Sequence, residues 1–90
     1  FQARAVLEVI RTLPDLLGFE VKTIAGLSNL TTGTRDKNKK NLVEQSYIAM
    51  LAASGLDYLM MDVLNHETLR VAKTSDIIIK TDIFSWEMIP

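Results

Sequence analysis

The sequence GLDYLMMD, at residues 55–62, is the stretch that decides the fold. It is almost continuously apolar, which is typical of a strand covered on both faces, as in a parallel sheet. It follows a helical pattern at 39–54, and Gly55 suits the end of that helix because glycine adopts a left-handed backbone at little cost. We therefore predict a helix over 39–54 and a strand over 56–61 that ends at Asp62. Five residues are expected on one face of that helix: Val43, Tyr47, Met50, Leu51 and Ser54.

A comparable unit comes before this one. Apolar side chains recur at helical spacing near the start of the chain: Val6, Val9, Ile10, Leu13 and Leu17. We expect Pro14 to end this helix or to restart a turn. An extended run at 20–25 contains several β-branched residues and predicts a strand that Gly26 closes. The polar residues at 27–38 predict a loop, and a loop of this length in a compact fold is often functional.

The residues after Asp62 predict a third helix and an apolar tail. Asn65 is placed to cap the helix, and Glu67 is favourable in its first turn. The tail at 77–90 is apolar, and we expect its side chains to dock on a neighbouring surface.

The order helix, strand, helix, strand, helix predicts an α/β fold with parallel strands. Two strands are too few for a stable open sheet with both faces covered. The chain also starts at Phe1, already inside a helical pattern. We therefore expect these residues to be part of a larger domain rather than a complete one.

The composition excludes several classes of protein. The chain has 90 residues, of which 48 % are hydrophobic and 23 % charged, and its formal net charge is −1. These values are typical of a globular domain and give no electrostatic footprint for nucleic acid. The absence of Cys excludes a disulfide scaffold, a thiolate nucleophile and a Cys zinc site. We expect a cytoplasmic protein that binds no metal itself. We also expect no membrane span, because polar residues interrupt the most apolar stretch of the chain.

Candidate site residues follow from the predicted strands. In parallel α/β folds, binding sites form at the carboxyl ends of the strands. That rule brings Gly26, Asn29 and Asp62 to the same rim. Each also has a purely structural interpretation: Gly26 relieves backbone crowding, Asn29 forms a turn, and Asp62 caps the end of a strand.

A group of cations lies before and at the start of the second predicted helix: Arg35, Lys37, Lys39 and Lys40. Cations at a helix N-terminus oppose the helix dipole, so a nearby anion would be favourable. A folate glutamate tail or an acidic partner surface would supply that anion, and a solvated loop is the alternative. The only His, His66, is expected to be a surface residue. No Gly-rich phosphate loop is present.

Four short motifs carry a resemblance to a known family: TIAGLSNL at 23–30, YIAM at 47–50, ASGLD at 53–57 and MD at 61–62. In this order and spacing they resemble the carboxyl-terminal part of the methyltetrahydrofolate:corrinoid protein methyltransferases. These enzymes belong to the pterin-binding superfamily, with dihydropteroate synthase. The similarity covers residues 22–83. It implies a (β/α)8 TIM barrel of roughly 250 residues, of which this chain would hold about the last two βα units.

The resemblance also implies roles for individual residues. Asn29 would contact N5 of the pterin, the nitrogen that carries the methyl group, as the catalytic residue. Gly26, Ser28 and Asp62 would join it in binding the substrate. Methyltetrahydrofolate would be the methyl donor, and a corrinoid protein would be the partner whose cobalt accepts the methyl group. A homo-oligomer is expected, with no role for nucleic acid or a membrane.

Two departures and two alternatives accompany this interpretation. The first departure is that Lys40 and Glu44 stand where family members often carry Arg and Asn. The second is that the loop at 31–38 carries more Lys than is expected for the family. Both affect the choice of partner more than the pterin. One alternative is a dihydropteroate synthase relative, but the phosphate-binding Arg of that family has no clear counterpart here. The other is a non-catalytic assembly module. We expect the 90-residue chain alone to be inactive, because catalysis needs groups positioned by several strands.

Overall fold

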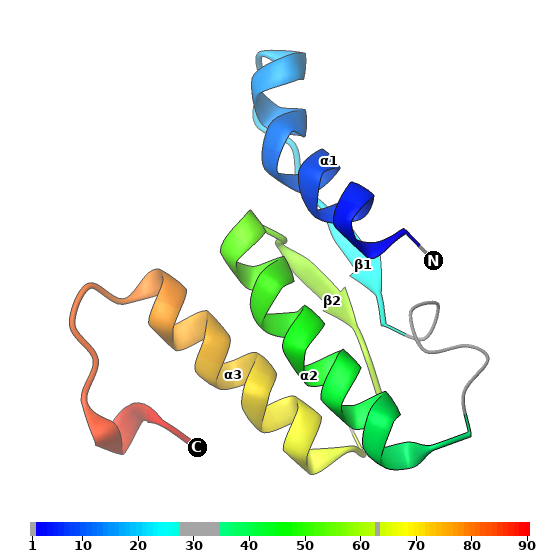
Figure 1. Cartoon of the computed structure of the whole chain (residues 1–90). Coiled ribbons are helices and arrows are strands. Elements are labelled where there is room, and N and C mark those ends of the chain that lie inside the picture. The colour runs from blue at the N-terminus through cyan, green and yellow to red at the C-terminus, as the bar shows by residue number, and fades with distance from the viewer. Residues whose placement is uncertain (1, 28–34, 63) are drawn as a thin grey trace.

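The computed structural model describes residues 2–27, 35–62 and 64–90. Its elements, in chain order, are α1 (Ala3–Leu17), β1 (Ile24–Gly26), α2 (Lys37–Ser54), β2 (Tyr58–Met60), α3 (His66–Lys80) and the short 3₁₀ helix η1 (Trp86–Met88) (Figure 1). β1 and β2 pair in parallel. The fold is therefore a helix-rich α/β arrangement, and the predicted order of elements and parallel strands are confirmed. No helix in these described ranges has the length and apolar character to cross a membrane.

α1 runs to Leu17 with Pro14 inside it, so the expectation that Pro14 ends the helix is wrong. The proline lacks the N–H that would donate to the carbonyl of Ile10, but its fixed φ is compatible with a helix, so α1 continues for three more residues despite that lost bond. The helix ends at Gly18, whose positive φ of 70° is accessible to glycine, and the Gly18 N–H donates to the carbonyl of Pro14 at 3.0 Å.

Both ends of α2 are fixed by capping residues. Asp36 caps the start, because its Oδ1 accepts hydrogen bonds from the backbone N–H groups of Asn38 and Lys39 at 3.0 and 3.2 Å. This cap starts the helix at Lys37, two residues before the predicted boundary. At the other end, Gly55 adopts a φ of 97° and closes the helix, as predicted.

The buried face of α2 differs from the predicted one. Its buried residues are Glu44, Tyr47, Ile48 and Leu51. Val43 and Met50, which were expected on the same face as Tyr47 and Leu51, are exposed. The buried stripe is turned because α1 and α3 both pack against α2, which is the crossover between the strands. The hydroxyl of Tyr47 donates to the carbonyl of Ala3 at 3.1 Å and joins α2 to α1.

The sheet is shorter than the sequence suggested, with three residues in each strand rather than the predicted runs at 20–25 and 56–61. Gly26 belongs to β1 and pairs with Met60, rather than closing the strand. Backbone hydrogen bonds extend the pairing at both ends, from Tyr58 N to Thr23 O and from Leu27 N to Met60 O, each at 3.0 Å.

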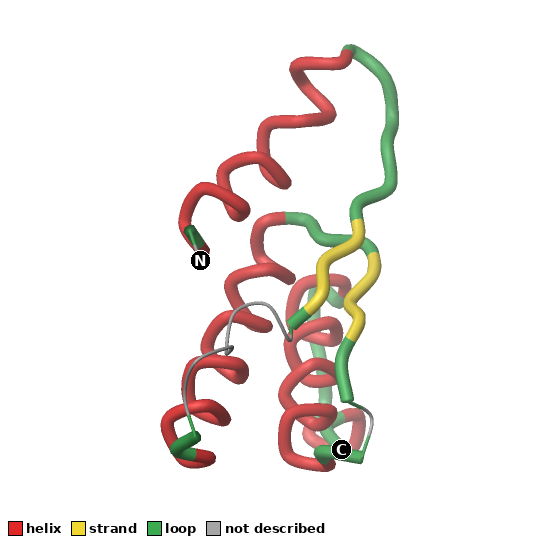
Figure 2. The backbone as a smooth tube through the Cα atoms, turned by 90° about the vertical axis from the view of Figure 1, so that its right-hand side faces the viewer, coloured by secondary structure: helices red, strands yellow, loops and turns green. Residues whose placement is uncertain are grey.

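Side chains alternate across this sheet, as strand geometry requires. Ala25 and Leu59 pack against the core, whereas Ile24, Tyr58 and Met60 are exposed. Figure 2 shows the helices on one side of the two strands. The expectation that β2 is covered on both faces is therefore not met within the described part of the chain.

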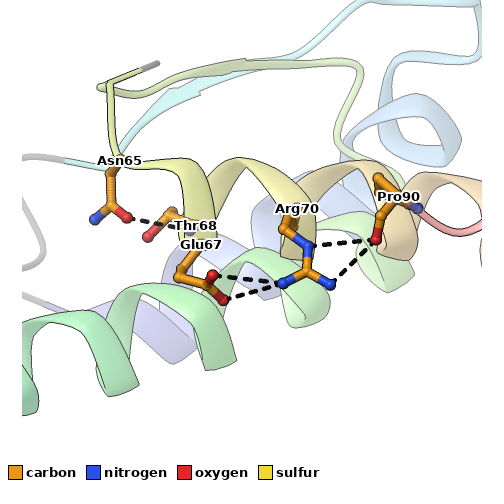
Figure 3. Close-up of polar contacts among 5 residues, drawn as sticks. All are labelled: Asn65, Glu67, Thr68, Arg70 and Pro90. Carbon is orange, nitrogen blue, oxygen red and sulfur yellow. Dashed lines mark hydrogen bonds and ion pairs between the residues drawn. The ribbon is translucent and has the colours of Figure 1, made fainter.

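α3 begins with the predicted cap. The side-chain Oδ1 of Asn65 accepts a hydrogen bond from the Thr68 N–H at 3.2 Å (Figure 3). Further along α3, Arg70 donates through Nε and Nη2 to the carbonyl of Pro90, at 3.3 and 3.2 Å, and so fastens the last residue to the helix.

The predicted docking of the tail is wrong for four of its apolar side chains, because Ile83, Phe84, Trp86 and Met88 are all exposed. Ile83 is 89 % exposed and Trp86 82 % exposed. The Trp86 ring meets Phe84 edge-on at a centroid distance of 5.6 Å, so its described aromatic contact is local.

A polar contact joins the two chain segments that lead into the N-terminal ends of β1 and β2. The Thr23 N–H donates to Oδ2 of Asp57 at 2.8 Å, and the Thr23 hydroxyl donates to the same oxygen at 3.3 Å. The backbone hydrogen bond to Thr23 favours the charged carboxylate and lowers the pKa of Asp57. A carboxyl whose pKa is lowered by folding stabilises the fold above its ordinary pKa of about 4, and this contribution is lost as the pH falls through the lowered value.

The Asp57→Asn variant tests this contact. We expect a lower free energy of unfolding than the wild type at about pH 7, because a neutral carboxamide accepts the Thr23 N–H bond more weakly. The difference should shrink by about pH 3, where the wild-type carboxylate is also being protonated. Urea unfolding of the wild type and the variant at the two pH values measures the difference in their free energies of unfolding. The exposed Asp82→Asn variant is the control, and a difference that stays constant with pH would contradict the assignment.

Candidate functional site

The parallel register brings Gly26 and Asp62 to one edge of the sheet. Gly26 pairs with Met60, and Asp62 follows Met60 by two residues. The carboxyl ends of the two strands therefore meet where the sequence placed the candidate site. Ser28 and Asn29 lie outside the described residues.

A cleft of about 710 Å³ opens at this edge. One wall comes from α2, which contributes Lys37, Lys40, Asn41 and Glu44. The other comes from the end of β2 and the start of α3, and it includes Asp62, Leu64, Asn65 and Thr68. Leu27, directly after β1, completes the lining together with Met60 and Met61. Ligand sites in proteins have volumes of this order, with a few polar groups that fix orientation.

Asp62 has a structural task in this cleft. Its Oδ1 accepts a hydrogen bond from the Leu64 N–H at 3.0 Å, and its backbone carbonyl accepts from the Asn65 N–H at 3.2 Å. The capping role considered for Asp62 is thus present. Among the described residues, its Oδ2 forms no hydrogen bond, so one carboxylate oxygen is left to accept from a ligand.

Asn41 is a cleft residue that sequence reasoning missed. Its Oδ1 accepts a hydrogen bond from Nδ2 of Asn65 at 3.1 Å, which joins α2 to the start of α3. Because Asn65 Oδ1 also caps α3, this one carboxamide fixes both the helix start and the neighbouring helix. The signal was available in the polar residues at positions 37, 40, 41 and 44, whose spacing places them on one face of a helix.

The structure divides the predicted basic group. All four cations are exposed, but Lys37 and Lys40 line the cleft and Arg35 and Lys39 do not. The imidazole of His66 does not line the cleft either. The cleft therefore selects two of the four cations that the sequence grouped together.

Gly26 has ordinary surroundings. A Cβ built on it would meet no described atom within 4 Å, and its φ is not in the left-handed region. The expectation that glycine relieves backbone crowding at this position is therefore wrong among the described atoms.

Comparison of the chain with protein-family models, with curated proteins and with solved structures finds no significant match. The resemblance to the corrinoid methyltransferases thus rests on the sequence motifs alone. A functional argument has to start from the strand ends and the cleft.

Thr68 carries an unsatisfied polar atom at the cleft wall. The residue is 1 % exposed, and its Oγ1 has no hydrogen-bond partner among the described residues. A buried hydroxyl without a partner costs roughly 1–3 kcal/mol of stability. Thr68 is one of the most deeply buried side chains among the described residues, and it lies on α3 in the lining of the cleft, so this cost falls on the packing beside the cleft.

The Thr68→Val variant replaces the hydroxyl by a methyl group of the same shape. We expect the free energy of unfolding to rise by about 1 kcal/mol, since an unmet desolvation cost disappears and no described hydrogen bond is lost. Urea unfolding measures this change. Thr68→Ser is the matched control, because it keeps the hydroxyl and should lower stability by about 1 kcal/mol through lost packing. A valine variant less stable than the wild type would reveal a partner for the hydroxyl.

Proposed function

We propose that the protein acts in methyl transfer from N5 of methyltetrahydrofolate to the cobalt of a corrinoid protein. In this proposal β1 and β2 are the last two strands of a pterin-binding (β/α)8 TIM barrel. The observation that carries it is the parallel register that brings Gly26 and Asp62 to one edge, beside a cleft of about 710 Å³. In the sequence, the motif GLSN begins at Gly26, the last residue of β1, and the motif MD directly follows Met60, the last residue of β2.

Asn29 is assigned the central role by the resemblance. The methyl group leaves a tertiary amine, which is a poor leaving group, so N5 must gain positive character before the methyl moves. A carboxamide is too weak an acid to protonate N5. Its oxygen can accept a hydrogen bond from N5 once a proton from solvent has reached that nitrogen, and it then stabilises the positive charge there. When the methyl group moves to cobalt, N5 keeps the electron pair of the broken C–N bond and becomes neutral. The corrinoid partner, when bound, supplies the cobalt nucleophile.

Asp62 is proposed to orient the pterin. The carboxylate lines the cleft, and its Oδ1 is held by the Leu64 N–H. That hydrogen bond fixes the side chain and directs the other oxygen to a different donor. The amino group and ring N–H groups of a pterin are suitable donors for such an oxygen. Asp62 thus supports a binding role, while Asn29 carries the chemistry.

Replacement of Asn29 by Ala in the full-length protein tests the proposal. We expect the rate of methyl transfer from methyltetrahydrofolate to cob(I)alamin to fall by about 100-fold, the usual cost of removing one stabilising hydrogen bond. The change in corrinoid absorbance measures the rate. Asn38→Ala is the matched control, because Asn38 is exposed and its side chain does not line the cleft. An Asn29→Ala enzyme with the wild-type rate and pterin affinity would refute the assignment.

A second candidate, an assembly module, is favoured by the outward face of the sheet. Ile24, Tyr58 and Met60 are exposed there, and two short strands leave backbone edges available for pairing. Both features are typical of a surface that another chain or domain covers. This function needs no pterin, so Asn29→Ala leaves it unchanged.

Sedimentation of residues 1–90 tests this second candidate. We expect self-association that increases with concentration, because the exposed apolar face is removed from water on contact. The Met60→Lys variant should shift the equilibrium toward monomer by placing a charge on that face. Met50→Lys is the control, since Met50 is similarly exposed but lies on α2. A wild-type chain that stays monomeric at all concentrations would count against the assembly role.

A further inference from the structure

The wall of the cleft that α2 provides is polarised along the helix. Lys37, Lys40 and Glu44 all line the cleft, and they follow one another at helical spacing. With a rise of 1.5 Å per residue, Lys37 and Glu44 are separated by about 10 Å along the helix axis. The cleft is therefore basic beside the first turn of α2, and the buried carboxylate lies further along the same wall.

The two lysines are available for an anion. Among the described residues neither forms an ion pair, whereas Lys22 and Lys80 each do. The nearest acidic residue in sequence, Asp36, already accepts hydrogen bonds from the backbone N–H groups of Asn38 and Lys39. Lysine in the first turn of a helix is unfavourable, because the helix dipole is positive there. An anion in the cleft would be attracted by both lysines and by the helix terminus.

We propose that Lys37 and Lys40 bind the carboxylates of the folate glutamate tail. This inference rests on the proposed function and names the part of the substrate that this wall recognises. The opposite wall, with Asp62, offers an acceptor that suits the hydrogen-bond donors of the pterin ring. A folate has donors at one end and carboxylates at the other, so it matches the two walls in one orientation.

Isothermal titration of the full-length protein with two ligands tests the proposal. One ligand is methyltetrahydrofolate, and the other is an N5-methylated tetrahydropterin that lacks the p-aminobenzoylglutamate tail. For the double variant Lys37→Gln and Lys40→Gln, we expect folate affinity to fall by about tenfold or more, since charge-assisted contacts are lost. Affinity for the tail-less pterin should stay at the wild-type value.

A matched variant and a salt series complete the design. Lys39→Gln removes a cation from the same turn of α2 but outside the cleft, and it should leave both affinities unchanged. Wild-type affinity for the folate should fall with rising salt more steeply than affinity for the tail-less pterin. Circular dichroism of the double variant verifies that α2 is intact.

The possible outcomes separate this inference from the proposed function. Wild-type folate affinity in the double variant would overturn the lysine assignment and leave the proposed function standing. Equal losses for both ligands would also overturn it, because the lysines would then act on the pterin site or the fold. A wild-type protein that binds neither ligand would contradict the proposed function, and the tail assignment with it.

Discussion

The parallel pairing of β1 with β2 is the constraint on which the rest of the structure depends. Each strand has only three residues, so contacts other than the backbone hydrogen bonds between the strands are needed to stabilise the pairing. Asp57 holds the entrance through Thr23, and α2 buries Ile48 and Leu51 over the inner face as it crosses between the strands. Because the strands run in the same direction, both chain segments leave the sheet at one edge. The cleft exists where they diverge toward α2 and α3.

The features of the fold that could be predicted from the sequence are those set by local chemistry. Gly55 ends α2 because it takes a left-handed backbone, and Asn65 starts α3 because its carboxamide replaces a missing backbone acceptor. Features set by packing were not predictable in the same way. The buried face of α2 depends on where α1 and α3 lie, and periodicity alone does not distinguish neighbouring stripes. Pro14 was misjudged because a proline removes one backbone hydrogen bond without necessarily ending the helix that contains it.

The candidate site also contains some features that the sequence predicts and others that depend on packing. That Gly26 and Asp62 share an edge follows from strand direction, which the order of elements predicts. The contact between Asn41 and Asn65 depends on how two helices approach each other, so it was beyond a reading of either segment alone. The same approach decides that Lys37 and Lys40, but not Lys39, line the cleft. These cations are neighbours in the sequence, but the helix directs their side chains to different faces, and only one of those faces lines the cleft.

In the proposed function, the start of α2 combines an unfavourable helix-dipole interaction with a role in ligand recognition. Asp36 supplies a favourable cap, yet the next turn carries Lys37, Lys39 and Lys40, which oppose the dipole. Local rules are broken most often where a protein uses a residue for something other than stability. The structure also places two of these cations on the wall of a cleft that has an acidic group on its opposite side. In the proposed function, the unfavourable lysines of α2 give the cleft a basic wall, and that wall would favour one orientation of a substrate with unlike ends.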